Sequence, residues 1–150
     1  MSVEIKIGSP LGADARKLIA QSEEVLRSFY SEDECFSFTP EELVAEHIDF
    51  YLASIDGEAM GCVALVQKKN YGEIKRLFVS TKARGKGLAK QLMARLEADA
   101  KAAGLNSVKL ETGEKLVEAV QLYHSLGYSV CGPFGSYEDL PASLFMTKQL

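Results

Sequence analysis

The chain has 150 residues, of which 47% are hydrophobic and 25% are charged, a balance typical of a globular domain and not of a disordered chain. Its 17 Lys and Arg residues against 21 Asp and Glu residues give a formal net charge of −4, which argues against a general nucleic-acid binder. We therefore expect a single domain over residues 1–150 with no nucleic-acid partner.

The cysteine pattern and the N-terminus give expectations about metal content and location. Cys35, Cys62 and Cys131 are far apart and show no metal-ligand or disulfide spacing, so we expect reduced thiols and no metal site. The first residues lack the basic and apolar regions of a signal peptide. The longest apolar run, Ala59 to Val66, is far shorter than the roughly 20 residues that cross a membrane. These features predict a cytoplasmic protein with no membrane partner.

The first half of the chain is predicted to contain a strand, helices and then three strands. Val3–Ile7 alternates with period two, which favours a strand, and residues 11–30 carry apolar positions that favour a helix. Thr39-Pro40, followed by two glutamates, is typical of a helix start. The three strands are expected over residues 48–55, 59–67 and 71–79, and Asp56-Gly57 provides a hairpin signal between the first two.

The second half is predicted to alternate helices with short strands. Apolar residues recur at helical spacing from Leu88 to Ala100, and Gly104 ends that helix. A second apolar stripe runs from Leu116 to Leu126 and stops at Gly127. The remaining strands are expected over residues 107–111, 128–130 and 144–147. The element order indicates a mixed sheet with helices packed on it.

A glycine-bearing loop between a strand and a helix predicts an anion site. Gly85 and Gly87 lack Cβ atoms, so their backbone N–H groups can approach a ligand closely. The helix that follows Gly87 adds unpaired N–H groups and the positive end of its dipole. All five charged residues from Lys82 to Arg95 are basic, although the protein is acidic. We therefore expect a local anion-binding cradle at this loop.

Three glycine-loop motifs compete for this segment. The chain contains no G-x-x-x-x-G-K-[ST] sequence of a P-loop. A dinucleotide-binding G-x-G-x-x-G/A motif would place Lys90 at its third small position. The β-hairpin that precedes the loop also does not fit the first βαβ unit in which that motif occurs. The pattern R-x-x-G-x-G/A is satisfied by Arg84, Gly87 and Ala89 and resembles the pyrophosphate loop of the GNAT N-acetyltransferase superfamily. A basic helix N-terminus with a tight turn is the structural alternative.

A second block, downstream, strengthens the resemblance to GNAT proteins. Residues 119–128 read AVQLYHSLGY and are similar to the family signature A-x-x-L/F-Y-x-x-x-G-F/Y. The resemblance extends from about Tyr51 to the C-terminus. It implies an α/β (α+β) GNAT fold: a mixed, mostly antiparallel central sheet that splays at two parallel strands and is flanked by helices. Acetyl-CoA would lie between those two strands, here residues 72–79 and 107–112.

The resemblance also implies which residues hold acetyl-CoA, the co-substrate. The pantetheine arm would pair with the backbone of Leu77, Phe78 and Val79. The pyrophosphate would be held by six consecutive residues: Arg84, Gly85, Lys86, Gly87, Leu88 and Ala89. Leu116 stands where many relatives have an asparagine that contacts the cofactor, so we assign it no polar role.

Catalytic roles follow from the chemistry and from the resemblance together. A primary amine has a pKa of about 10.4 and must lose a proton before it attacks, which a carboxylate can assist. Glu73 lies where the family often keeps a general base, and an exposed strand residue is the alternative for Glu73. Glu111 is the other candidate base and is otherwise interpreted as a structural or substrate-orienting acid, and water also stays open as the base. Tyr123 matches the general-acid tyrosine and could instead be a core aromatic. A backbone N–H near Phe78 or Val79, freed by a strand bulge, would stabilise the oxyanion.

The acceptor end is less well defined by the sequence. Residues 131–139 resemble a Pro-Phe-Gly-x-Tyr segment of small bacterial GNAT proteins, and Phe134 and Tyr137 are predicted as pocket walls. Eight acids between Glu23 and Glu46 oppose Arg27 alone, which suits either a cationic acceptor or a solvated helix surface.

These observations predict an N-acetyltransferase that acts on a primary amine of a small molecule or peptide. Two alternatives stay open: a protein lysine or N-terminal acetyltransferase, and a non-catalytic acyl-CoA-binding regulatory module. A pure binder would need neither Glu73 nor Tyr123, which argues for catalysis. A homodimer is an expectation from the family alone.

Overall fold

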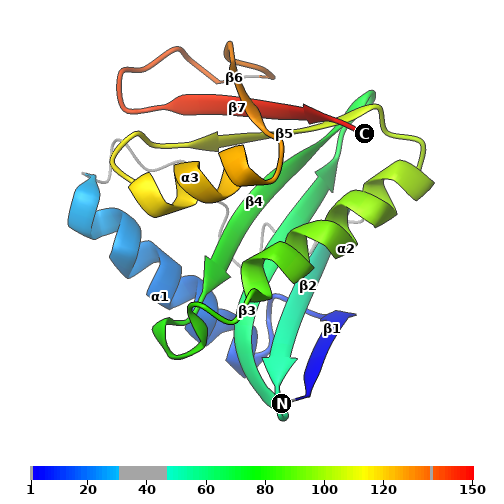
Figure 1. Ribbon diagram of the computed structural model, residues 1–150, viewed down its shortest axis with the longest axis vertical. Helices are drawn as coiled ribbons and strands as arrows, with labels where there is room; N and C mark the ends of the chain where they lie inside the picture. The colour runs from blue at the N-terminus through cyan, green and yellow to red at the C-terminus, as the bar shows by residue number, and fades with distance from the viewer. Residues whose placement is uncertain (1, 31–46, 136) are drawn as a thin grey trace.

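The computed structural model describes residues 2–30, 47–135 and 137–150, which form one seven-stranded sheet and three α-helices (Figure 1). The sheet order is β1-β2-β3-β4-β5-β7-β6. The strands are β1 (Val3–Ile7), β2 (Ile48–Ile55), β3 (Glu58–Gln67), β4 (Tyr71–Val79), β5 (Ser107–Thr112), β6 (Ser129–Cys131) and β7 (Leu144–Gln149). The helices are α1 (Ala13–Phe29), α2 (Leu88–Ala102) and α3 (Val117–Ser125).

The sheet opens between its two central parallel strands. Every other neighbouring pair is antiparallel, and only β4 and β5 run in the same direction. Their pairing begins at Tyr71 with Ser107 and ends at Ile74 with Leu110, although β4 continues to Val79. The two strands therefore separate beyond Ile74, which confirms the predicted mixed sheet that splays at two parallel strands.

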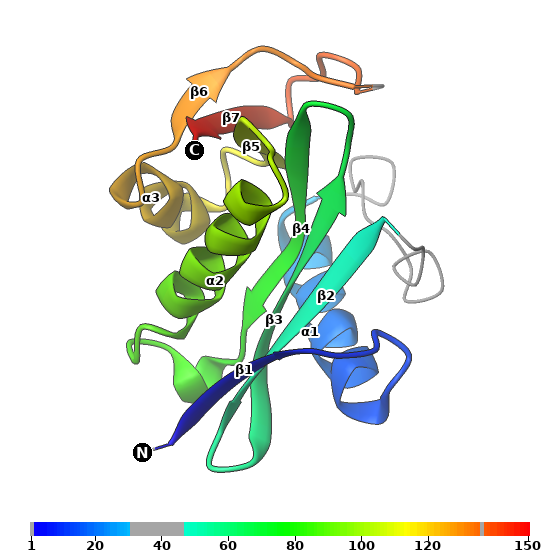
Figure 2. The same cartoon turned by 90° about the vertical axis from the view of Figure 1, so that its right-hand side faces the viewer.

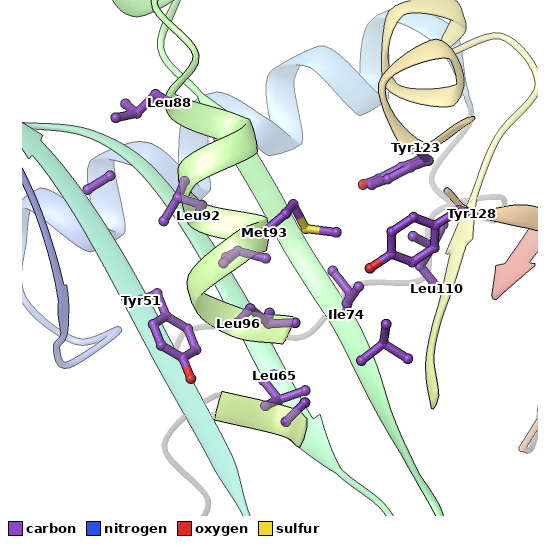
Figure 3. Packing of buried hydrophobic residues seen from close by; sticks show 14 of the residues in the cluster. Tyr51, Leu65, Ile74, Leu88, Leu92, Met93, Leu96, Leu110, Tyr123 and Tyr128 are labelled. Atoms are coloured by element: carbon purple, nitrogen blue, oxygen red, sulfur yellow. The ribbon is translucent and has the colours of Figure 1, made fainter. Parts of the chain in front are cut away.

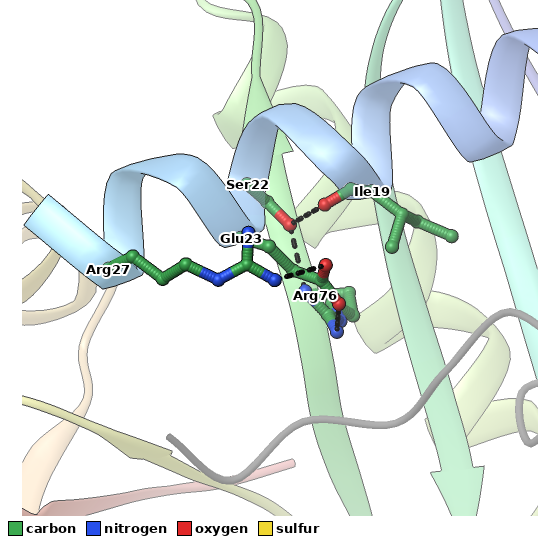
Figure 4. A network of polar contacts seen from close by, with 5 residues as sticks. All are labelled: Ile19, Ser22, Glu23, Arg27 and Arg76. Carbon is green, nitrogen blue, oxygen red and sulfur yellow. Dashed lines mark hydrogen bonds and ion pairs between the residues drawn. The ribbon is translucent and has the colours of Figure 1, made fainter. Parts of the chain in front are cut away.

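A bulge in β4 lies beside this opening. The register with β3 moves from Cys62 opposite Phe78 to Ala64 opposite Lys75, so one extra residue is accommodated on β4. Arg76 takes the left-handed conformation there, with φ of 59°. Its guanidinium donates to Glu23 Oε1 at 2.8 Å and to Ser22 Oγ at 3.0 Å (Figure 4). This buried arginine ties α1 to the strained point of β4.

Helices cover both faces of the sheet (Figure 2). On one face, Ala15, Leu18 and Ile19 of α1 pack against β2, β3 and β4. On the other, α2 and α3 cover the sheet, and the predicted apolar stripe of α2 forms the centre of the core (Figure 3). The side chains of that stripe are all buried: Leu88, Leu92, Met93, Leu96 and Ala100.

The predicted elements agree with the described ones to within a few residues at their ends. α1 begins at Ala13, two residues after the predicted start, and β6 begins at Ser129. The helix start at Thr39-Pro40 lies outside the described residues, as does Cys35. Cys62 is buried and Cys131 half-buried, both as free thiols. Among the described helices, none has both the length and the apolar character to cross a membrane.

Candidate active site

A cleft of about 1050 Å³ opens where β4 and β5 separate. Its walls come from the C-terminal half of α1, from β4 beyond Ile74, from the loop before α2, and from the end of β5 with α3. Because α1 covers one face of the sheet and α3 the other, the cleft passes through the opening in the sheet. It can thus admit two reactants from opposite faces.

Backbone conformation forms one end of the cleft. Gly85 and Gly87 have φ of 80° and 75°, a region that costs a residue with a Cβ about 1–3 kcal/mol. Open space surrounds both glycines, so it is the backbone angle that requires glycine here. α2 starts at Leu88 with no acidic residue in its first turn. Its unpaired N–H groups therefore present positive charge to this end of the cleft.

The predicted pyrophosphate-binding residues mostly line this end. Arg84, Gly85, Gly87, Leu88 and Ala89 all contribute to the wall, and Lys90 joins them. The exposed Lys86 lies outside the wall. The arrangement fits a diphosphate because N–H groups and basic side chains converge on one space.

Arg84 is held across this end of the cleft by an acid. Its guanidinium donates to Glu118 Oε2 on α3 at 3.0 Å and to the Val79 carbonyl at 3.4 Å. The Glu118 side chain is 84% exposed, so the ion pair is weak. A bound phosphate would compete with Glu118 for the same guanidinium.

The middle of the cleft presents an open strand edge. Leu77, Phe78 and Val79 line it, and the last two pair with Cys62 and Gly61 of β3 on their other side. Among the residues that the structure describes, the edge toward β5 has no ladder partner beyond Ile74. Backbone groups on that edge are thus available to the amides of a pantetheine arm, as predicted for these residues.

Glu111 brings a carboxyl into the part of the cleft at the end of β5, which we call the reacting end. The β5 residue lines the wall, and burial raises its pKa to about 7. Glu73 contributes to the rise by like-charge repulsion, while the nearby Ser143 hydroxyl and Lys75 ammonium oppose it. A carboxyl with this pKa is ionised in about half of the molecules at neutral pH and binds a proton readily there.

Tyr123 of α3 lines the same cleft as Glu111. Its side chain is 7% exposed and also lines the cleft, and its ring makes an edge contact with Tyr128 at 5.8 Å between centroids (Figure 3). Burial raises the pKa of the phenol, and the neighbouring Glu111 carboxylate raises it further. The hydroxyl therefore stays protonated at neutral pH and can act as a proton donor.

Glu73 lies behind the cleft wall rather than in it. Its carboxylate forms an ion pair with Lys75 at 3.2 Å and accepts a hydrogen bond from the Tyr137 hydroxyl at 2.5 Å. Glu73 is 4% exposed and is not among the lining residues. Glu73 therefore forms a buried ion pair with Lys75, whereas Glu111, the other predicted carboxylate, lines the cleft.

The predicted pocket walls Phe134 and Tyr137 are not among the residues that line this cleft. Their rings contact each other at 5.3 Å, and each contacts Phe145 of β7, at 5.7 and 5.6 Å. Phe134 contacts Tyr71 in addition, at 5.7 Å. These edge contacts pack the two rings against β7, and their role as walls of an acceptor pocket stays a prediction.

Lys75 and Tyr30 are among the lining residues that were not predicted from the sequence. Lys75 lines the cleft and forms an ion pair with Glu73. The only feature of the sequence that could have indicated its position is the alternation of β4. Tyr30 ends α1, and its hydroxyl accepts the Lys115 N–H at 3.0 Å. A Cβ on Gly113 would collide with the Tyr30 hydroxyl, so this contact requires a glycine directly after β5. That glycine is the feature of the sequence that could have indicated the contact.

The acidic region of residues 23–46 is only partly described. Glu23 is engaged with Arg76 and, at 3.4 Å, with Arg27, while Glu24 lies one residue further along α1. The remaining acids of that region, and Ser136 in the aromatic loop, lie outside the described residues. Glu23 thus stabilises α1 on the sheet rather than facing an acceptor.

Known proteins resemble this chain in sequence and in fold. The model of the acetyltransferase (GNAT) family matches residues 15–128. An IAA acetyltransferase of Azospirillum brasilense is 36% identical over 151 residues, which cover 99% of both chains. A Klebsiella pneumoniae protein described as an acyl-CoA N-acyltransferase matches with a TM-score of 0.84 at 30% identity, over 99% of this chain and 97% of that one. PaiA N-acetyltransferase of Thermoplasma acidophilum, in complex with coenzyme A, has the same fold, with a TM-score of 0.82 at 21% identity over the full length of both chains.

Proposed function

Because the chain belongs to the acetyltransferase (GNAT) family and is an acyl-CoA-dependent acetyltransferase, we propose that it acetylates the primary amine of a small molecule. The observation that carries the proposal is that Glu111 and Tyr123 both line the cleft at the opening between β4 and β5, where the Glu111 charge raises the pKa of the Tyr123 phenol. The name of the Azospirillum relative supports a small-molecule acceptor. We expect the reaction to take place in the cytoplasm.

The residues of the loop and of the open strand edge suit acetyl-CoA. Arg84, Lys90 and the N–H groups around Gly87 would hold its phosphates, and the edge from Leu77 to Val79 would bind its pantetheine amides. When bound, acetyl-CoA supplies an acyl group activated as a thioester. Leu116 also lines the cleft and offers only apolar contact, so the polar recognition would come from the backbone groups and from Arg84 and Lys90.

Glu111 is the proposed general base. An acceptor amine with a pKa of about 10.4 enters largely protonated, and the carboxylate accepts the proton that it must lose, directly or through one water. Burial raises the pKa of Glu111 to about 7, which is closer to the pKa of the amine than the pKa of an ordinary glutamate is. We favour Glu111 over Glu73, the other candidate base, because Glu73 is engaged with Lys75 and Tyr137.

Tyr123 is the proposed general acid. Its hydroxyl donates a proton to the departing sulfur, whose conjugate thiol has a pKa of about 8.5. Because burial and Glu111 raise the pKa of Tyr123, the transfer is uphill, and it is favoured when Glu111 has already taken up a proton. Base and acid thus act in sequence on neighbouring groups.

Acetyl-CoA and a panel of acceptors test the proposal, with thiol release and product mass as readouts. The panel contains simple alkyl and aryl amines, amino acids, polyamines and short peptides. We expect saturable acetylation of at least one free amine by the wild-type protein and loss of that activity in Glu111→Gln. Acetylation restricted to peptides would favour a protein-modifying enzyme, and tight binding without any turnover would favour a regulatory module; either result contradicts the proposal.

A further inference from the structure

The bulge in β4 interrupts the ladder at the opening of the sheet. The register with β3 passes over Arg76 and Leu77, and the register with β5 has already ended at Ile74. Within the described ranges, Arg76 and Leu77 therefore stand outside both ladder registers, and both line the cleft. We call these two residues the bulge stretch. Because a bulge disrupts the ladder locally, other contacts have to fix the position of this stretch.

The side chain of Arg76 is held by α1 (Figure 4). Its guanidinium donates to Glu23 Oε1 at 2.8 Å and to Ser22 Oγ at 3.0 Å. The Ser22 hydroxyl gives its own proton to the Ile19 carbonyl at 2.7 Å, so its oxygen can accept from the guanidinium. Since the Arg76 side chain is only 3% exposed, these contacts form away from water and hold it firmly.

The backbone of Arg76 is held from another side by β3. The Cys62 thiol donates to the Arg76 carbonyl at 3.4 Å. Burial raises the pKa of Cys62 to about 12, so the thiol keeps its proton at neutral pH. Between these two supports Arg76 has φ of 59°, a conformation that is unfavourable for a residue with a Cβ. Contacts of the side chain and of the carbonyl therefore maintain a backbone shape that the ladder does not.

The bulge stretch lies at the reacting end of the cleft. The last ladder pair of β4 and β5 joins Ile74 to Leu110, and Leu110 directly precedes Glu111. When an amine attacks a thioester, the C–N bond forms and the carbonyl oxygen carries negative charge until the C–S bond breaks. Hydrogen-bond donors that are already in position stabilise that charge. A displacement of about 1 Å in such a group can cost about 10²-fold in rate.

We propose that Arg76, Glu23 and Ser22 are positioning residues for acetyl transfer. The two α1 residues fix the Arg76 side chain, and Arg76 in turn fixes the backbone of the bulge stretch against the reacting carbonyl. α1 thus supports the rate of the reaction through β4, in addition to covering the sheet. This role belongs to the transfer step, so it goes beyond the proposed acceptor and applies to amines of small molecules and of peptides alike.

Substitutions on α1 test these roles by steady-state kinetics, with any acceptor that the panel identifies. Glu23→Ala should lower kcat about tenfold and leave KM for acetyl-CoA within about twofold, because the loop before α2 does not change. Glu23→Gln should lose only about threefold, because its amide oxygen can still accept from Arg76. Ser22→Ala removes the second acceptor and should also lose about threefold.

Two controls on the same helix separate this effect from a general effect of α1. Glu24→Ala removes the neighbouring exposed carboxylate, and Arg27→Ala removes the cation whose Nη2 lies 3.4 Å from Glu23 Oε2. Both should keep kcat within about twofold. Alanine favours the helix, so none of the alanine substitutions weakens α1 through helix propensity. NMR shifts and hydrogen exchange of the Arg76 and Leu77 amides should change in Glu23→Ala and not in the controls.

The outcomes are distinct. A loss of kcat in Glu23→Ala and Ser22→Ala, with changed amides in the bulge stretch and unchanged controls, supports the positioning roles. An equal loss in either control, changed amides without a loss of kcat, a loss of kcat without changed amides, or a rise in KM alone overturns them. If Glu23→Ala does not fold in a urea titration, Glu23→Gln and Ser22→Ala decide. Acetylation of peptides only would contradict the proposed function, while the same ratios of kcat would still test the positioning roles.

Discussion

The two ends of the cleft are built in different ways. At the loop before α2, positive φ angles at Gly85 and Gly87 and a helix N-terminus create the binding surface from backbone groups. At the reacting end, Glu111 and Tyr123 depend on side chains from several elements that burial and charge adjust. Binding of the cofactor and catalysis should therefore respond separately to mutation.

Glu111→Gln should separate the two ends most strongly. The amide keeps the size of the side chain but cannot accept the acceptor's proton, so we expect kcat to fall by about 10²–10⁴-fold. The Kd for coenzyme A should stay within about twofold, because no part of the loop changes. Steady-state thiol release and calorimetry measure the two quantities, and Glu114→Gln is a matched control on the exposed loop nearby.

Tyr123→Phe should have the next largest effect, about 10²-fold on kcat. The phenyl ring preserves the packing in the core, so the loss reports the hydroxyl alone. Tyr128→Phe is the control: its hydroxyl donates to Glu97 at 2.8 Å, away from the cleft. Equal rates for Tyr123→Phe and Tyr128→Phe would assign Tyr123 to the core only.

The buried Glu111 carboxylate at the reacting end should also lower the free energy of unfolding. The loop end has no such effect. Since folding raises the pKa of Glu111 from 4.5 to about 7, the folded state binds more protons between these pH values, and this residue's contribution to stability falls as pH rises. Glu111→Gln should therefore raise the free energy of unfolding by about 2 kcal/mol at pH 8 and by much less at pH 4. Urea titrations at both pH values measure this difference. An equal gain in the free energy of unfolding at both pH values would contradict the raised pKa of Glu111.

Gly87→Val tests the loop end. A β-branched residue at φ of 75° is strained, so the backbone should move and the Kd for coenzyme A should rise about tenfold or more. Gly104→Val is the matched control, because Gly104 has φ of 85° in similarly open space at the other end of α2. Weaker binding in both variants would point to general destabilisation rather than to the loop.

Glu118→Gln should give the smallest effect. Removal of this exposed carboxylate releases Arg84 for the phosphates, so coenzyme A should bind about two- to fivefold more tightly at low salt. The gain should shrink as salt screens the charges. Glu114→Gln again serves as control, and weaker binding by Glu118→Gln would show that the acid supports the site.

The sequence predicts the loop end well because its determinants are local. Gly85, Gly87 and the apolar stripe of α2 lie within one strand-loop-helix segment, and their spacing alone predicts its conformation. The hairpin at Asp56-Gly57 is local in the same way, and Asp56 takes positive φ there.

The reacting end is less predictable because its contacts join distant residues. Tyr137 reaches Glu73 across 64 positions and Arg76 reaches Glu23 across 53. Both contacts depend on strand register and on a bulge, which no short pattern encodes. Glu73 and Glu111 were therefore both identified as candidates, but only the three-dimensional arrangement distinguishes the engaged carboxylate from the one in the cleft.

The pH dependence of kcat/KM, measured with acetyl-CoA at saturation and the amine found in the acceptor panel, tests the central claim most directly. The account predicts that activity rises through one ionisation near pH 7, where burial has placed the pKa of Glu111, and that Glu111→Gln loses this step. A step near pH 7 that persists in Glu111→Gln, or a wild-type profile without it, would contradict Glu111 as the base.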